Sequence, residues 1–181
     1  MKTLLRTTTT SADAILSEAL ISAVEGEFYN YDYKFVLSRP VFALLKCKSN
    51  KGRPVKSLAD LGTEANMLFM FGDGTTAEVW PVQLANSAGV LGSKFNEEHF
   101  GNTYVGITDL SGEQFHAIRD EQDTHIMVMN CRCFCNADEK ITVKQGDVFA
   151  AMTDSGKYGL FHVQEVGSDH VLINACHILL R

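Results

Sequence analysis

Three cysteines at alternate positions are the residues in this chain whose type and spacing best fit chemistry. They lie in the stretch NCRCFCN as Cys131, Cys133 and Cys135. A thiolate is both a nucleophile and a metal ligand, so a close group of thiols can hold an ion or attack a substrate. An unpaired cysteine also packs in an apolar core as a small hydrophobic side chain. Metal binding, covalent chemistry and burial are therefore the three uses to weigh.

Residues 124–134, THIMVMNCRCF, are predicted to form a strand that carries the first two of these cysteines. Alternate side chains of a strand lie on one face, about 6.6 Å apart. One face would then hold His125, Met127, Met129, Cys131, Cys133 and Cys135. A zinc site needs sulfurs within about 4 Å of one another, which this spacing does not give. The stripe of methionine and cysteine therefore favours burial in a core.

Metal binding and enzymatic chemistry remain as alternatives. A bend near residues 136–138 would bring Cys135 back toward Cys133, with ligands added from another strand. The candidate metal ligands are then Cys133, Cys135, Cys176 and His177. A cysteine-dependent enzyme would draw on Cys131, Cys133, Cys176 and His177, at a site between two β halves. His162 is expected on the wetter face of its strand, as a surface or partner-facing histidine.

Sequence motifs for the common catalytic sites are absent. The chain holds no phosphate-binding loop, no dinucleotide-binding fingerprint, no HExxH and no GxSxG. No catalytic residue and no cofactor are assigned on this basis. The balance favours a non-catalytic protein, and an enzyme stays the alternative.

Composition predicts a cytoplasmic protein of ordinary globular type. The chain has 181 residues, of which 45% are hydrophobic and 21% charged, enough to bury a core without disulfides or metal. Five cysteines, an odd number, without a secretion signal favour a reducing compartment. The sequence contains no run of about 18 apolar residues, so no membrane-spanning helix is predicted. We expect the protein in the cytoplasm, or in a virus particle after cytoplasmic synthesis.

Charge is distributed unevenly along the chain, although the net charge is −6. Residues 34–56 hold seven of the sixteen basic residues and no acid, whereas residues 97–123 hold seven acids against Arg119. Such blocks are typical of solvated surfaces, or of two opposite patches through which copies of one chain meet. The partner-binding candidates of the basic block are Lys46, Lys48, Lys51, Arg53 and Lys56. Nucleic acid is an unlikely ligand, because no aromatic residues interleave with these cations.

Trp80 is a further partner-binding candidate. It precedes Pro81, and a proline favours an edge strand because it has no N–H for a sheet ladder. An exposed Trp80 would bind a partner strand or peptide, whereas a buried one would be core, which is the preferred interpretation. Pro40 and Pro81 are both expected at a strand start, a bulge or an edge.

The elements expected around these residues are mostly strands. Helices are predicted at residues 12–25, and from Asp109 or Ser111 to about Asp120, with Gln114 three places after Ser111 as in a capping box. Turns are predicted at Asp73-Gly74 and Ser155-Gly156, and a long loop at residues 86–102. The strands expected are 33–37, 41–47, 66–71, 76–84, 103–107, 124–134, 141–143, 147–153, 158–166 and 170–179.

A weak internal repeat suggests two related halves. Val41-Phe42-Ala43 recurs as Val148-Phe149-Ala150, and further short matches follow at offsets of 104 to 107 residues. The predicted fold is mainly β, of α+β type: antiparallel meanders forming a β-sandwich or two small open barrels, with an N-terminal helix and one short central helix. The predicted parts are 1–30 (arm and helix), 31–85 (first meander), 86–124 (loop and helix) and 125–181 (second meander).

The function these patterns favour is structural. We expect an assembly protein that acts through protein–protein contacts, as a homo-oligomer or in a larger body such as a virion or a secretion apparatus. The alternative is a small-ligand or metal-binding domain, or the cysteine-dependent enzyme described above.

Overall fold

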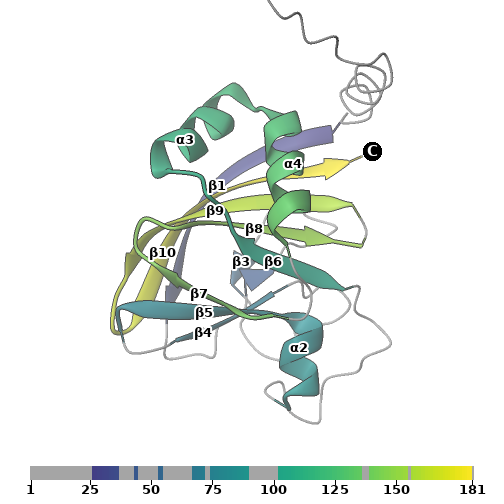
Figure 1. The fold of residues 1–181 in the computed structure, drawn as a ribbon. Coiled ribbons are helices and arrows are strands. Elements are labelled where there is room, and N and C mark those ends of the chain that lie inside the picture. Colours follow the sequence, from purple (N-terminus) through teal and green to yellow (C-terminus); the bar gives the residue numbers. More distant parts are fainter. Residues whose placement is uncertain are drawn as a thin grey trace, which may run out of the picture.

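The computed structural model describes residues 26–36, 43–44, 53–54, 67–71, 74–89, 102–135, 139–154 and 156–180. The predicted helix at 12–25, Pro40 and most of the predicted loop at 86–102 lie outside these ranges. The described part is mostly β, with antiparallel sheets and few helices, which confirms the predicted class (Figure 1). Within it, no helix is both long and apolar enough to cross a membrane.

The larger sheet has five antiparallel strands. Its order is β1 (Gly26–Val36), β10 (His170–Leu180), β9 (Lys157–Val166), β8 (Val148–Thr153) and β6 (Thr103–Ile107). Strands β8, β9 and β10 are consecutive in sequence and form the predicted meander. Gly156 has φ of 77° in the β8–β9 turn, a backbone conformation that glycine adopts without strain. The predicted turn there is confirmed, and Ser155 itself lies outside the described residues.

A second sheet has three antiparallel strands. Its order is β4 (Met67–Phe71), β5 (Thr76–Pro81) and β7 (Ile141–Lys144). Strands β4 and β5 pair as the hairpin predicted around Asp73-Gly74, with Gly74 at φ of 90°. Asp73 itself lies outside the described residues. Two short strands, β2 (Ala43–Leu44) and β3 (Arg53–Pro54), pair with each other. Most of residues 41–66 lie outside the described part, so the duplication stays a hypothesis.

The five-stranded sheet buries a different cluster on each face, because successive side chains of a strand point to opposite sides. One cluster joins it to β5 and β7, and its largest members are Phe149, Phe161 and Ile173. The other lies under the helices and includes Phe115, Met127, Leu160 and Ile178. In Figure 1 the helices α3 and α4 cover one face of this sheet, and β4, β5 and β7 lie on the other side.

Helix α3 (Gly112–Glu121) confirms the predicted central helix. Ser111 is its N-cap, and the capping box with Gln114 is complete. Phe115 and Ile118 are buried toward the sheet, as expected.

Residues 124–134, by contrast, form helix α4 (Thr124–Phe134), so the predicted strand is wrong. The Asp123 side chain caps α4 by accepting a hydrogen bond from the N–H of Ile126, at 2.9 Å. The side chains that face the sheet are Met127, Val128 and Cys131, which have the three-to-four spacing of a helix.

The predicted strand over residues 76–84 is too long. Strand β5 ends at Pro81, and Val82–Ser87 form the short helix α2. Pro81 is therefore the last residue of its strand and the N-cap of the helix, where a missing N–H costs nothing. The Gln83 side chain donates to the carbonyl of Thr103 at 2.5 Å and accepts from its N–H at 3.1 Å, next to the start of edge strand β6.

Candidate functional site

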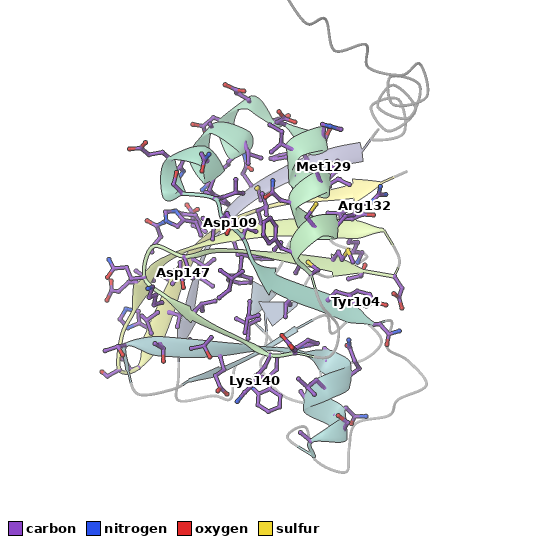
Figure 2. The ribbon with its side chains drawn as sticks, viewed as in Figure 1. Tyr104, Asp109, Met129, Arg132, Lys140 and Asp147 are labelled. Carbon is purple, nitrogen blue, oxygen red and sulfur yellow. The ribbon has the colours of Figure 1, made fainter. Side chains whose placement is uncertain are left out.

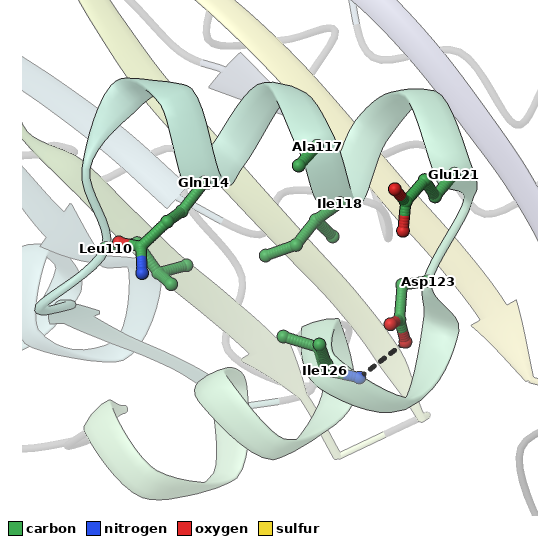
Figure 3. Close-up of a pocket in the computed structure, with 7 residues that line it drawn as sticks. All are labelled: Leu110, Gln114, Ala117, Ile118, Glu121, Asp123 and Ile126. Atoms are coloured by element: carbon green, nitrogen blue, oxygen red, sulfur yellow. Dashed lines mark hydrogen bonds between the residues drawn. The ribbon is translucent and has the colours of Figure 1, made fainter.

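A groove of about 170 Å³ lies between α3 and α4. Its walls come from both helices, as Figure 3 shows. The residues that line it are Leu110, Gln114, Ala117, Ile118, Glu121, Asp123 and Ile126. The lining is thus aliphatic in its centre and has polar or acidic groups at its edge. Such a recess fits an aliphatic side chain better than a polar ligand.

A tight turn holds the two helices at a fixed spacing. Gln122 ends α3 in the left-handed conformation with φ of 55°. The N–H of Asp123 then donates to the carbonyl of Ile118 at 3.0 Å, which closes the end of α3. Because Ile118 and Met127 are buried in the same cluster, both walls of the groove are fixed to the sheet. The groove is therefore a preformed feature of this surface.

Large aliphatic side chains are exposed beside the groove. Ile126 is 43% exposed and Met129 is 38% exposed, one turn apart on the outer side of α4. Figure 2 labels Met129 beside α4. Ile107, which is 42% exposed, is the third large apolar side chain of this kind in the described ranges. An apolar groove with exposed aliphatic neighbours is typical of a protein contact surface.

The helix pair is acidic. Arg119 pairs with Asp32 of β1 at 3.0 Å, so the single arginine of α3 is engaged by a carboxylate. The exposed acids around it are Asp109, Glu113, Asp120 and Glu121. Glu97 and Glu98, which the sequence places in the same acidic block, lie outside the described residues. The exposed surface of α3 and of the residues just before it is therefore mainly negative.

The three cysteines do not share a face, because they lie on or next to a helix. Cys131 is fully buried and its thiol donates to the carbonyl of Gly159 at 3.4 Å. Burial raises the pKa of Cys131 well above its ordinary value and raises that of Cys135 to about 12. Cys133 is exposed. The prediction of burial is correct for Cys131, wrong for Cys133 and only partly met by Cys135, which is half-buried. The raised pKa values make the thiols of Cys131 and Cys135 poor nucleophiles.

Cys176 and His177 do not complete a metal site with these thiols. Both lie on β10, where adjacent side chains point to opposite faces, and only Cys176 belongs to the cluster under the helices. Burial raises the pKa of Cys176 to about 12. Across the described ranges, no group of three or more histidine, cysteine, aspartate or glutamate side chains is placed to hold a metal ion.

His162 lies on the helix face of β9, whereas its neighbours Phe161 and Val163 belong to the other cluster. The predicted alternation is thus correct, but His162 is half-buried under α3 rather than at an open surface. Its ring lies 5.4 Å from that of His116, at 77°, and Gln164 contacts its Nδ1 at 2.7 Å. Desolvation, and then the charge of His116, lower the pKa of His162. Near-perpendicular rings do not aim two nitrogens at one ion.

Trp80 is neither on an edge strand nor in the core. Strand β5 pairs with β4 on one side and with β7 on the other, so it is the central strand of its sheet. The Trp80 ring is half-buried on the outer face and donates from Nε1 to Glu78 at 3.0 Å. The Lys140 ammonium lies 4.8 Å from the ring centre and 2.6 Å from the Glu78 carboxylate, beside the label in Figure 2. The indole of Trp80 is therefore already in contact with Lys140 and Glu78 of the same chain.

Among the basic candidates, only Arg53 lies in a described element, strand β3. Lys46, Lys48, Lys51 and Lys56 fall outside the described residues.

The sequence pattern does not predict the groove, because it predicts a strand at residues 124–134, which supply the second wall. The signals that identify α4 are the Asp123 cap and the spacing of Met127, Val128 and Cys131. No family model, no curated protein and no solved structure matches the chain.

Proposed function

We propose that the protein is a non-catalytic assembly component that works by contact with other protein chains, copies of itself among them. The body that presents this surface is a β-sandwich, an inference supported by the apolar cluster that the two sheets share. A virus particle or a secretion apparatus is the kind of assembly we expect, with synthesis in the cytoplasm.

The observation that carries this proposal is the groove between α3 and α4. It combines a mostly aliphatic lining that includes the exposed Ile126 with the acidic side chains of Glu121 and Asp123, and Met129 is exposed one turn further along α4. An aliphatic side chain flanked by cations would fill the centre and meet the acids at the same time. Buried thiols with raised pKa values support the same interpretation, because they disfavour the cysteine-dependent enzyme.

A binding measurement on matched variants tests the proposal. The probe is a fluorescent peptide with two leucines between lysines, and its affinity is read by fluorescence polarisation. Ile126→Ser should weaken binding about fivefold to tenfold, because it removes roughly 1 kcal/mol of apolar contact. Ile107→Ser is the control, since Ile107 is exposed to nearly the same degree but lies on β6. Equal affinity of the two variants, or no saturable binding by the unaltered protein, would overturn the groove as a contact surface.

A further inference from the structure

We infer that the α3–α4 groove is the acidic half of a head-to-tail contact between copies of this chain, and that its occupant is the basic segment 45–56 of a second copy. This inference rests on the proposed function and names its partner. It predicts a repeating contact in which each copy offers a groove to one neighbour and a basic segment to the other.

Charge complementarity is the first support. The block at residues 34–56 carries seven of the sixteen lysines and arginines and no acid. The four exposed acids of the helix pair belong to the block of opposite sign, and Arg119 is already paired with Asp32. In a chain with a net charge of −6, this block is the one concentrated source of positive charge that matches the groove.

The apolar centre of the groove has a matching side chain in the same segment. Val55 stands between Arg53 and Lys56, and Leu45 directly precedes Lys46. Val55 is thus flanked by cations on both sides, and Leu45 has a cation on one side. One of them entering the groove would bring lysine or arginine to Glu121 at its edge.

The placement of the two surfaces makes the contact intermolecular. Strands β2 and β3 pair at Ala43–Pro54 and Leu44–Arg53, so they bring together the two ends of residues 45–52. Strand β2 contacts β4, which belongs to the sheet on the far side of the molecule from α3 and α4 (Figure 1). Strand β2, which directly precedes the basic segment, therefore contacts the sheet that does not carry the groove. Two different surfaces that meet in this way form a heterologous contact, which extends into chains or closes into rings.

Sedimentation velocity of the full chain at two salt concentrations tests this arrangement. At about 0.05 M salt the protein should form species larger than a dimer as its concentration rises, and at about 1 M, where the screening length is about 3 Å, these should dissociate. A groove variant, Asp120→Lys with Glu121→Lys, should weaken association at least about tenfold through like-charge repulsion. Both positions end α3, where lysine suits the helix dipole, so the variant should keep its fold.

Mixing two defective variants separates this model from a symmetric dimer. The second variant replaces Lys46, Lys48 and Lys51 with glutamine and keeps an intact groove. Each variant alone should remain monomeric, whereas the mixture should form one-to-one pairs and nothing longer, because only one pair of complementary surfaces survives. Glu139→Lys, a charge change of the same size as Glu121→Lys but near β7, is the control and should assemble like the unaltered protein.

The results separate this inference from the proposed function. A monomeric protein at low salt, or a groove variant that assembles normally, overturns the head-to-tail contact. If Ile126→Ser still weakens binding of the leucine–lysine peptide in that case, the groove serves a different protein partner and the proposed function stands. If assembly does not depend on the groove and Ile126→Ser also leaves peptide binding unchanged, the groove has neither role.

Discussion

Replacing Gly106 with alanine should displace the last turn of α4 from the five-stranded sheet. Gly106 lies in β6, and a Cβ at this position would overlap the carbonyl group of Phe134 and lie 3.1 Å from the nitrogen of Cys135. These are backbone atoms at the end of α4, so no change of side-chain rotamer relieves the overlap. The helix must move, and with it Cys131, which α4 holds against the carbonyl of Gly159.

The expected cost follows from what this movement disturbs. Forcing one extra methyl group into a packed interface costs about 1 to 3 kcal/mol, and partial exposure of Cys131 adds to it. We expect the free energy of unfolding to fall by about 3 kcal/mol. The matched control is Gly146→Ala: nothing lies within 4 Å of a Cβ there, and the positive φ of 90° alone should cost about 1 kcal/mol.

Urea unfolding and thiol labelling together measure this effect. The midpoint of unfolding should fall further for Gly106→Ala than for Gly146→Ala, with little change in the slope. At the same time, Cys131 should react faster with a thiol reagent in the Gly106 variant only. A Gly106→Ala protein within about 0.5 kcal/mol of the original, with Cys131 still protected, would refute the close approach of α4 to β6.

Two further predictions concern titrating groups. In the unaltered protein at neutral pH, a thiol reagent should label the exposed Cys133 first. Cys135 and Cys176 should react far more slowly, because burial raises their pKa values to about 12. Labelling of Cys176 at the rate of Cys133 would contradict the burial of β10 under the helices. The pKa of His162 is lower in the folded protein than its ordinary value of 6.5, so as the pH falls His162 is protonated in the unfolded chain before it is protonated in the folded protein. The free energy of unfolding should therefore decrease as the pH drops below 6.5 and through the lower pKa of the folded state. Urea midpoints measured at about pH 7.5 and about pH 5 should therefore differ more in the original protein than in His162→Gln, and identical differences would exclude this histidine as the cause.

The elements that could be predicted are those whose sequence pattern fits only one kind of secondary structure. Strand β6 was predicted with its observed bounds, and α3 with its Ser111 cap, because a short aromatic and β-branched run and a capping box each specify one structure. The β8–β9–β10 meander followed from alternation and a glycine turn.

Helix α4 was missed because its sequence satisfies two periods at once. Met127 and Cys131 are four residues apart, so they share a face both in a strand and in a helix. Ile126 and Val128 raise the strand propensity of the run, and the cysteines extend the alternation beyond the true end of the helix. The Asp123 cap is the sequence signal that favours the helix, and contact with the sheet selects it, through the burial of Val128 and the exposure of Met129. The groove depends on that contact, so its shape does not follow from the sequence pattern alone.

The side-chain amide of Gln83 forms hydrogen bonds with the backbone of β6 at Thr103, as a neighbouring strand would do. By exchanging two hydrogen bonds with the backbone of Thr103, it occupies the first position at which another polypeptide could extend the ladder. Growth of this molecule into a fibril by backbone pairing is thereby blocked at one end of that margin. The proposed contact through ionic and aliphatic side chains would, by contrast, reverse when salt or dilution changes.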